Sequence, residues 1–307
     1  MNQIVNFSYF GEIAMLCAAL CWSIAVIIFK SASKKISPIL IVALKNTIAL
    51  IAFLILFYCI DAPLWYSNLS YSDYIKIIIS GCLGMGIGDA LFIYALSQIG
   101  ANRVAIINCF EPAVIYFFSI IMLGTLLTIQ QLIGFSIVMI SILIITYEKD
   151  FDDINPQKKH KGLLLQLCAV FLSSFGIVLI KPVLSKMNDG ILIQIWITAF
   201  RLFPGFIVAW IIFFLQKNPL ILLRPLKQST IIWKILLSSG LGTFIALSFW
   251  IIAYTNIEKP PVASIIGQTS VIFITIFSAI FLKETISKIR IISMTIALIG
   301  VLLITVK

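Results

Sequence analysis

Long apolar runs separated by short polar gaps dominate the sequence. A bilayer-crossing helix needs about 20 mainly apolar residues, and about ten runs of that length follow one another along the chain. The runs cover roughly residues 11–29, 38–60, 75–97, 104–123, 127–147, 162–180, 191–215, 235–255, 261–281 and 289–306. The pattern therefore predicts an all-α membrane protein with ten transmembrane helices and no separate soluble domain.

Composition points the same way. Hydrophobic residues make up 61% of the chain and charged residues 11%, with a mean hydropathy of +1.13, whereas soluble domains carry roughly 25% charged residues. The formal net charge of +10 comes from Lys and Arg that lie mostly between the apolar runs, as in membrane-protein loops rather than nucleic-acid-binding surfaces. The residues before Gly11 do not resemble a signal peptide. We therefore expect a multi-pass protein of the cell inner membrane that contacts the lipid bilayer and no nucleic acid.

The sequence is internally duplicated. KIIISGCLG from Lys76 matches KILLSSGLG from Lys234, an offset of 158 residues. The same offset holds without a gap as far as Lys149, which aligns with Lys307. Upstream, GEIAMLCAA matches GLLLQLCAV. Self-similarity at a fixed offset is typical of repeated structural units. The predicted repeats are residues 1–149 and 162–307, joined by a polar linker at 150–161.

Each predicted repeat holds five spans. Because five is odd, the second repeat enters the membrane upside down relative to the first. Inverted repeats are a recurring architecture of secondary transporters, whose substrate sites lie near the membrane midplane between the repeats. The predicted fold is therefore two five-helix inverted repeats around a central cavity.

Basic residues are divided unevenly between the two membrane faces. The connections that follow the first, third, fifth, seventh and ninth spans carry most of the Lys and Arg residues. By the positive-inside rule, this face lies in the cytoplasm and both termini lie outside.

Four ionisable residues lie deep in the predicted spans. Asp89 and Glu111 are acids, while Lys45 and Arg201 are bases that align with each other in the duplication. With a rise of 1.5 Å per residue, their depths converge on one slab of a ~30 Å hydrocarbon core. Charges at that depth are costly unless they pair, and they usually mark function. A purely structural network is the alternative, and Lys45 alone can also extend to the nearby surface.

The two acids belong to the first repeat only. Asp89 aligns with Leu247, and Glu111 aligns with Thr269. A carboxyl group in apolar surroundings can alternate between its protonated and ionised forms, which suits proton-coupled transport. Pro112 directly follows Glu111 and frees a backbone carbonyl that can line a cavity, and Pro204 is expected to interrupt its span in the same way.

Other side chains in these spans extend the candidate site. Aromatic residues in membrane proteins mostly anchor or pack helices, while Asn108 and Gln268 offer uncharged hydrogen-bonding groups. The glycines between Gly81 and Gly88 are assigned to close helix packing rather than to nucleotide binding. The candidate substrate-binding or coupling residues are Asp89, Glu111, Lys45, Arg201, Trp22, Tyr94, Asn108, Trp250, Tyr254 and Gln268.

Several segments also match a known family. They are ALCWS from Ala19, ALKN and AFRL in the second and seventh spans, IYALSQIGANRVAIINCFEP from Ile93, and FLKETISKIRIISMTIALIGVLLI from Phe281. Over nearly its whole length the chain resembles EamA-type ten-helix carriers of the drug/metabolite transporter superfamily. One first-half motif departs from the family pattern, with Leu126 where an acid is common.

The resemblance implies a 5+5 inverted-repeat carrier that exports or exchanges small metabolites such as amino acids and needs no cofactor. It also implies that both termini lie in the cytoplasm, which conflicts with the charge count.

Together these observations predict a secondary transporter of a small polar metabolite, an amino acid or a related compound, with a proton as a candidate coupling ion. The balanced charges favour this substrate over a cationic drug, which is the main alternative. A non-transporting binding protein and an intramembrane enzyme are more distant alternatives, and the predicted spans contain no histidine for catalysis. We expect a monomer or homodimer with no metal and, without a Walker A sequence, no direct use of ATP.

Overall fold

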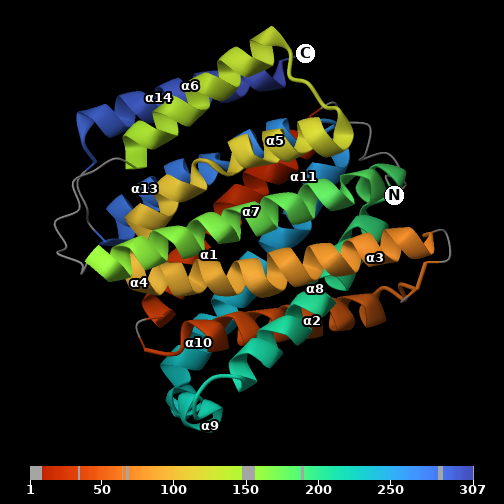
Figure 1. The fold of residues 1–307 in the computed structure, drawn as a ribbon, viewed down its shortest axis with the longest axis vertical. Helices are drawn as coiled ribbons and strands as arrows, with labels where there is room; N and C mark the ends of the chain where they lie inside the picture. The colour runs from red at the N-terminus through yellow and green to blue at the C-terminus, as the bar shows by residue number, and fades with distance from the viewer. Residues whose placement is uncertain are drawn as a thin grey trace.

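The computed structural model describes residues 9–33, 35–63, 65–66, 69–146, 156–187, 190–282 and 286–306. Within these ranges every regular element is a helix. Nine helical segments of this part of the chain are long and apolar enough to cross a membrane, and a further apolar helix, Ile129–Ile145, is shorter. The protein is therefore an all-helical membrane protein with several spans (Figure 1).

Spans in the first half are partly broken. After the continuous helices α1 and α2, the chain crosses through α3, the π-helix η2 and the first part of α4, which turns sharply at Gly100 (φ 78°). Its elements are α1 (Phe10–Ser33), α2 (Pro38–Cys59), α3 (Tyr71–Ser80), η2 (Gly81–Gly88), α4 (Asp89–Asn108), α5 (Glu111–Leu123) and α6 (Ile129–Thr146).

The second half repeats this order, with two short helices inserted after α8. Its elements are α7 (Pro156–Lys186), α8 (Ile191–Phe214), α9 (Pro219–Leu222), η3 (Arg224–Lys227), α10 (Ser229–Ser239), the π-helix η4 (Gly240–Ile245), α11 (Ala246–Asn256), α12 (Pro260–Gly267), α13 (Thr269–Leu282) and α14 (Lys288–Thr305).

The predicted polar linker at 150–161 is described only from Pro156, where α7 begins, because residues 150–155 lie outside the described residues. One local prediction, the interruption of a span at Pro204, is wrong. Pro204 lies inside α8 without breaking it. The Pro204 ring packs over Gly81, where an added Cβ would lie only 2.6 Å from the ring. Tight packing against η2 therefore holds α8 continuous although proline removes one of its hydrogen bonds.

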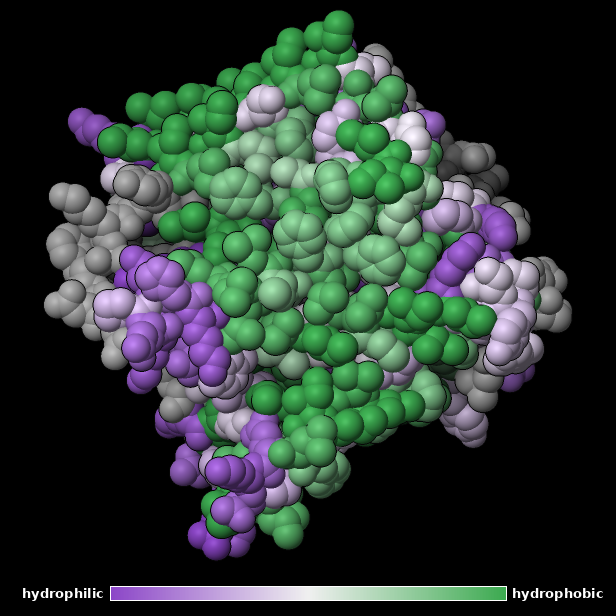
Figure 2. All heavy atoms as spheres, in the orientation of Figure 1, coloured by the Kyte–Doolittle hydropathy of each residue, from purple (hydrophilic) through white to green (hydrophobic). Residues whose placement is uncertain are grey.

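Hydrophobic side chains cover the outside of the helices. In Figure 2 they form a broad surface across the middle of the molecule, while hydrophilic side chains gather at the lower left and at the right. Most helices in Figure 1 run between these two ends. Because lipid offers no partners for polar groups, this distribution is the one expected for helices that cross a bilayer.

Helices α2 and α8, which align in the duplication, pack side by side and run in opposite directions. Trp210 Nε1 of α8 donates to Thr47 Oγ1 near the middle of α2 at 2.9 Å. Ser37 Oγ, just before α2, donates to Gln216 Oε1, just after α8, at 3.3 Å. The start of one helix therefore lies beside the end of the other.

The aligned helices α6 and α14 are also antiparallel. Gln130 Nε2 near the start of α6 donates to the carbonyl oxygen of Leu303 near the end of α14 at 2.9 Å. Between them, Gly134 and Gly300 let the two backbones meet: a Cβ at Gly134 would lie 2.8 Å from the Gly300 carbonyl oxygen. Small residues at helix crossings allow this close approach in membranes.

Duplicated residues also make duplicated contacts. Gly11 of α1 and Gly162 of α7 align in the sequence repeat. A Cβ at Gly11 would lie 2.8 Å from the Ile257 side chain, and a Cβ at Gly162 would overlap the Ile99 side chain. Ile99 and Ile257 are themselves 158 residues apart. The packing of α1 on the end of α11 is thus repeated by α7 on α4.

Candidate functional site

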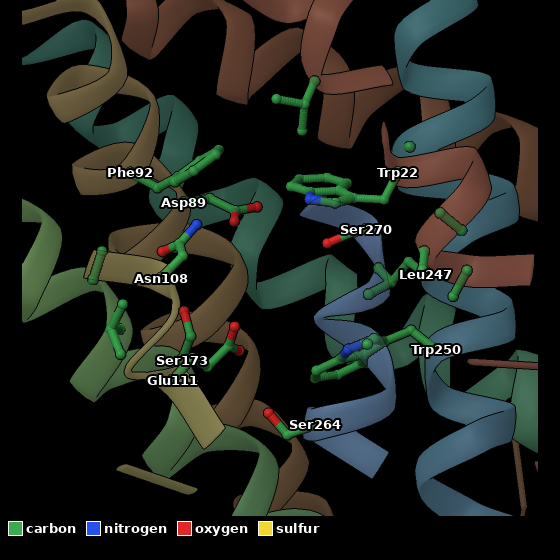
Figure 3. A pocket seen from close by; sticks show the side chains of 18 of the residues that line it. Trp22, Asp89, Phe92, Asn108, Glu111, Ser173, Leu247, Trp250, Ser264 and Ser270 are labelled. Atoms are coloured by element: carbon green, nitrogen blue, oxygen red, sulfur yellow. The ribbon is translucent and has the colours of Figure 1, made fainter. Parts of the chain in front are cut away.

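A cavity of about 280 Å³ lies between the two halves. Its walls come from α1, α2, η2, α4 and α5 of the first half and from α7, α8, η4, α11, α12 and α13 of the second. In Figure 3, Asp89, Asn108 and Glu111 lie along one wall, and Trp22 and Trp250 face them from the other. Its volume is slightly below the range of ~300–1,000 Å³ that is typical of ligand pockets, a size that suits only a small solute.

Two π-helices border this cavity at matching positions. With the 158-residue offset, η4 aligns with residues inside η2. The glycines of η2 bring it close to its neighbours: a Cβ at Gly84 would lie 2.9 Å from Arg201 Nη2, and a Cβ at Gly88 would lie 2.8 Å from Ser173 Oγ. The prediction that these glycines serve close packing is confirmed. π-Helical turns inside α-helices often occur at functional sites.

Lys45 is neutralised inside the first half. Its ammonium group, with the side chain 3% exposed, forms a salt bridge with Asp89 and donates to Asn46 Oδ1 at 3.2 Å. Asn46 Nδ2 in turn donates to the Met85 carbonyl oxygen in η2 at 3.1 Å. The pair joins α2 to α4 and removes the large cost of two isolated charges in an apolar interior.

Arg201 is held in place without a direct ion pair to any acid of the described residues. Its Nε donates to Ser80 Oγ at 2.8 Å, and Ser80 Oγ donates to the Gly176 carbonyl oxygen at 2.6 Å. The guanidinium carbon lies 5.3 Å from the ring centre of Trp250, a cation–π contact. The side chain is 1% exposed, and its Nη1 and Nη2 atoms have no hydrogen-bond partner within the described structure. Arg201 is also one of the residues that line the cavity.

Glu111 stands at a helix break. It is the first residue of α5, directly after the interruption at Cys109 and Phe110. The helix dipole favours an acid in this first turn. Among the described residues no base forms an ion pair with Glu111. The second half is broken at the same place, because α13 begins at Thr269, the residue that aligns with Glu111.

Asn108 joins the two halves at these breaks. Its side-chain Oδ1 accepts a hydrogen bond from Gln166 Nε2 of α7 at 2.5 Å. Its backbone carbonyl accepts one from Gln268 Nε2, between α12 and α13, at 3.2 Å. Sequence reasoning missed Gln166, although its alignment with Met15, a residue of the candidate first span, marks an apolar position that became polar in the second repeat.

The aromatic candidates fall into two groups. Trp22 and Trp250 line the cavity, as does Tyr254, whose ring centre lies 4.4 Å from that of Trp250. Tyr94 is not among the lining residues; its ring faces Lys161, with Nζ 5.9 Å from the ring centre. On a helix, Tyr94 points away from Phe92, its neighbour two positions earlier that does line the cavity.

The structure thus brings nine of the ten candidate residues to one cavity and places Tyr94 outside it. Their roles in binding or coupling stay predictions. In the part of the chain that the structure describes, no group of three or more His, Cys, Asp and Glu side chains is arranged to hold a metal ion.

Apolar spans in two duplicated halves, around an internal cavity that holds two acids and two bases, define a class of protein, the helical membrane carriers. The model of the EamA-like transporter family matches residues 9–147 and again residues 160–306. The chain belongs to this family and is a membrane transporter, a carrier rather than an enzyme.

Two individual proteins are also similar to this chain. Over 150 residues the chain is 26% identical to the uncharacterized transporter YoaV of Bacillus subtilis (strain 168), a match that covers 48% of this chain and half the length of YoaV. A solved structure described only as the crystal structure of a protein superposes with a TM-score of 0.74 over 95% of both chains, at 12% identity. That likeness concerns the fold alone.

Proposed function

We propose that this transporter moves a small polar metabolite, an amino acid or a related compound, and that the solute binds in the cavity between the two halves. The observation that carries the proposal is the cavity itself: both halves line it, and it holds two acids and two bases. A solute bound between two repeats can be exposed to either membrane face when one repeat rocks against the other.

The proposed architecture has ten spans in two inverted repeats, residues 1–149 and 162–307. Support comes from the antiparallel packing of the aligned pairs α2 with α8 and α6 with α14. We place the protein in the cell inner membrane as a monomer or homodimer.

Export or exchange with a proton as coupling ion is the proposed mode. Asp89 supports it, because a proton on this carboxyl would break its salt bridge with Lys45, and Glu111 lines the same cavity with no basic partner among the described residues. A change of protonation on either acid would alter the net charge that a solute meets.

Counterflow in proteoliposomes tests this function. Purified protein is reconstituted into liposomes, and the liposomes are loaded with one unlabelled compound from a panel of amino acids and organic cations. Exchange is followed by adding the labelled compound outside. We expect exchange of zwitterionic amino acids, and its loss in Asp89→Asn and Glu111→Gln. Asp61→Asn is the control, since it makes the same change in an exposed turn at φ 51°, a conformation that Asn accepts. Exchange of organic cations alone would favour the drug-exporter alternative, and unchanged exchange in both acid variants would contradict the proposed site.

A further inference from the structure

The cavity holds two bases at aligned positions, and among the described residues only one of them, Lys45, forms a direct ion pair. Lys45 pairs with Asp89. At the position that aligns with Asp89, the second half has Leu247, which also lines the cavity. No acid of the described residues forms an ion pair with Arg201. The second half therefore repeats the base without its acid.

The surroundings of Arg201 fix its orientation. The Ser80 hydroxyl holds Nε, and the Trp250 ring lies against the guanidinium group. Gly84 leaves the space that Nη2 occupies. The two atoms left over, Nη1 and Nη2, form the edge of the guanidinium group that binds a carboxylate through two parallel hydrogen bonds.

Leaving these donors unpaired is unfavourable. A buried donor without a partner loses its hydration and gains nothing in return, and here two such donors lie on a side chain that is 1% exposed. An anion from outside the chain would satisfy both at once. The arrangement is thus that of a receptor whose partner comes from the solute.

We propose that Arg201 binds a carboxylate group of the transported solute through Nη1 and Nη2, while Lys45 and Asp89 form a closed pair that does not contact this group. The proposal rests on the proposed function of the cavity and narrows its substrate to a class: small compounds that carry one carboxylate. It assigns different roles to two bases that occupy equivalent positions.

Charge balance favours a carboxylate over a phosphate ester. Lys45 and Asp89 cancel, so Arg201 is the single base of the described cavity that is free to meet an anion. Glu111 lines the same cavity and would repel a second negative charge on the solute. A phosphate group carries more charge than one guanidinium can balance, whereas a carboxylate with an ammonium group elsewhere in the solute matches both Arg201 and Glu111.

Binding can be measured without assuming the natural substrate. The purified full-length protein is titrated with the standard L-amino acids, their carboxamides, inorganic phosphate and glycerol 3-phosphate, and both melting temperature and tryptophan emission are recorded. Emission is informative because Trp250 lies on the guanidinium group. We expect one or more carboxylates to stabilise the protein. The matching carboxamide should bind with an affinity at least about tenfold lower.

Two variants of one residue then isolate the role of Arg201. Leu247→Asp introduces the acid that the first half has at the aligned position, and Leu247→Asn changes size and polarity without the charge. We expect carboxylate affinity at least about tenfold lower in Leu247→Asp than in Leu247→Asn, because the new acid competes for Nη1 and Nη2. Arg201→Lys, which keeps the charge and loses the two-donor edge, should also weaken binding.

The possible results separate this proposal from the function on which it rests. Equal affinity in the two Leu247 variants, or equal binding of carboxylates and carboxamides, overturns the role of Arg201. Stabilisation by phosphate compounds alone overturns the carboxylate class. Counterflow of solutes without a carboxylate removes the inference and leaves the transport function standing, while the absence of both binding and counterflow removes both.

Discussion

The two halves of the molecule are alike in helix packing and unlike in the side chains that face the cavity. Helices α5 and α13 begin at aligned residues, Glu111 and Thr269, and the π-helices η2 and η4 occupy matching places. Yet one of these residues is an acid and the other an alcohol, and Asp89 aligns with Leu247. Duplication has kept the contacts between backbones and changed the chemistry of the cavity.

This difference teaches which substitutions should behave alike in the two halves. Residues that set backbone contacts, such as Gly11 and Gly162, should respond equally. Cavity residues should respond unequally, because Lys45 forms an ion pair inside the chain, whereas no acid of the described residues forms one with Arg201. Substitutions at aligned positions therefore test the comparison directly.

The largest expected effect is the loss of stability when the Lys45–Asp89 salt bridge is broken. Lys45→Met leaves Asp89 without its base, and Asp89 is only 16% exposed, so we expect a loss of about 3 kcal/mol in stability. The double variant Lys45→Met/Asp89→Leu removes both charges and should regain most of that loss, because a buried pair is often replaceable by apolar groups. Thermal unfolding of the four proteins in detergent gives the coupling energy. If the two single effects simply add, the pair does not interact as described.

The next effect concerns the two matched glycines. Gly11→Ala and Gly162→Ala each place a methyl group against an isoleucine side chain, Ile257 or Ile99. We expect each to cost about 1–2 kcal/mol, because overpacking outweighs the better helix propensity of alanine. The same unfolding assay should give similar losses for both. A difference greater than about 1 kcal/mol would mean that the two contacts are not equivalent.

Part of this picture could be predicted from the sequence. The spans were predictable because a bilayer requires apolar runs of sufficient length. The duplication was visible because Lys, Gly and Cys-Ala positions recur at a fixed offset. The π-helices and the break between α4 and α5 were not predictable, since hydropathy does not distinguish α-helical from π-helical turns.

For the candidate site, the sequence predicted only how deep each residue lies in the membrane. The rise per residue places Lys45, Asp89 and Arg201 at similar heights in the membrane, but it does not say which helices are neighbours. Packing decides that Asp89 meets Lys45 and not Arg201. The sequence also does not say in which direction a side chain points around its helix axis. Tyr94 lies on the same helix as Phe92, but Phe92 lines the cavity and Tyr94 contacts Lys161.

A smaller effect is expected when the space for the guanidinium group is filled. In Gly84→Ala the new Cβ would lie 2.9 Å from Arg201 Nη2, so the guanidinium group must shift, and we expect affinity for a carboxylate solute to fall about tenfold. Gly240→Ala is the control in the other π-helix, because nothing lies within 4 Å of a Cβ there. Binding in the melting assay should be unaffected by Gly240→Ala. Equal effects of the two variants would show that alanine harms the π-helices themselves rather than the position of Arg201.

The smallest expected effect compares two lysines that tie the halves together at opposite ends of the helices. Lys186 of α7 forms a salt bridge with Asp73 of α3 at 3.1 Å, whereas Lys234 of α10 donates to the neutral Ser31 Oγ of α1 at 2.7 Å. The Lys186 side chain is 59% exposed, and Asp73, although 3% exposed, also accepts hydrogen bonds from the Ser70 backbone N–H and hydroxyl, so Lys186→Gln should cost only about 1 kcal/mol, and Lys234→Gln less. Salt separates the two contacts, because screening weakens an ion pair whose lysine is exposed to solvent and leaves a hydrogen bond to a hydroxyl largely unchanged. Melting temperatures at ~0.05 M and ~1 M salt should therefore show the deficit of Lys186→Gln shrinking while that of Lys234→Gln stays constant. If both deficits respond alike, charge does not distinguish the two ends of the molecule, and the contrast between the halves is confined to the cavity.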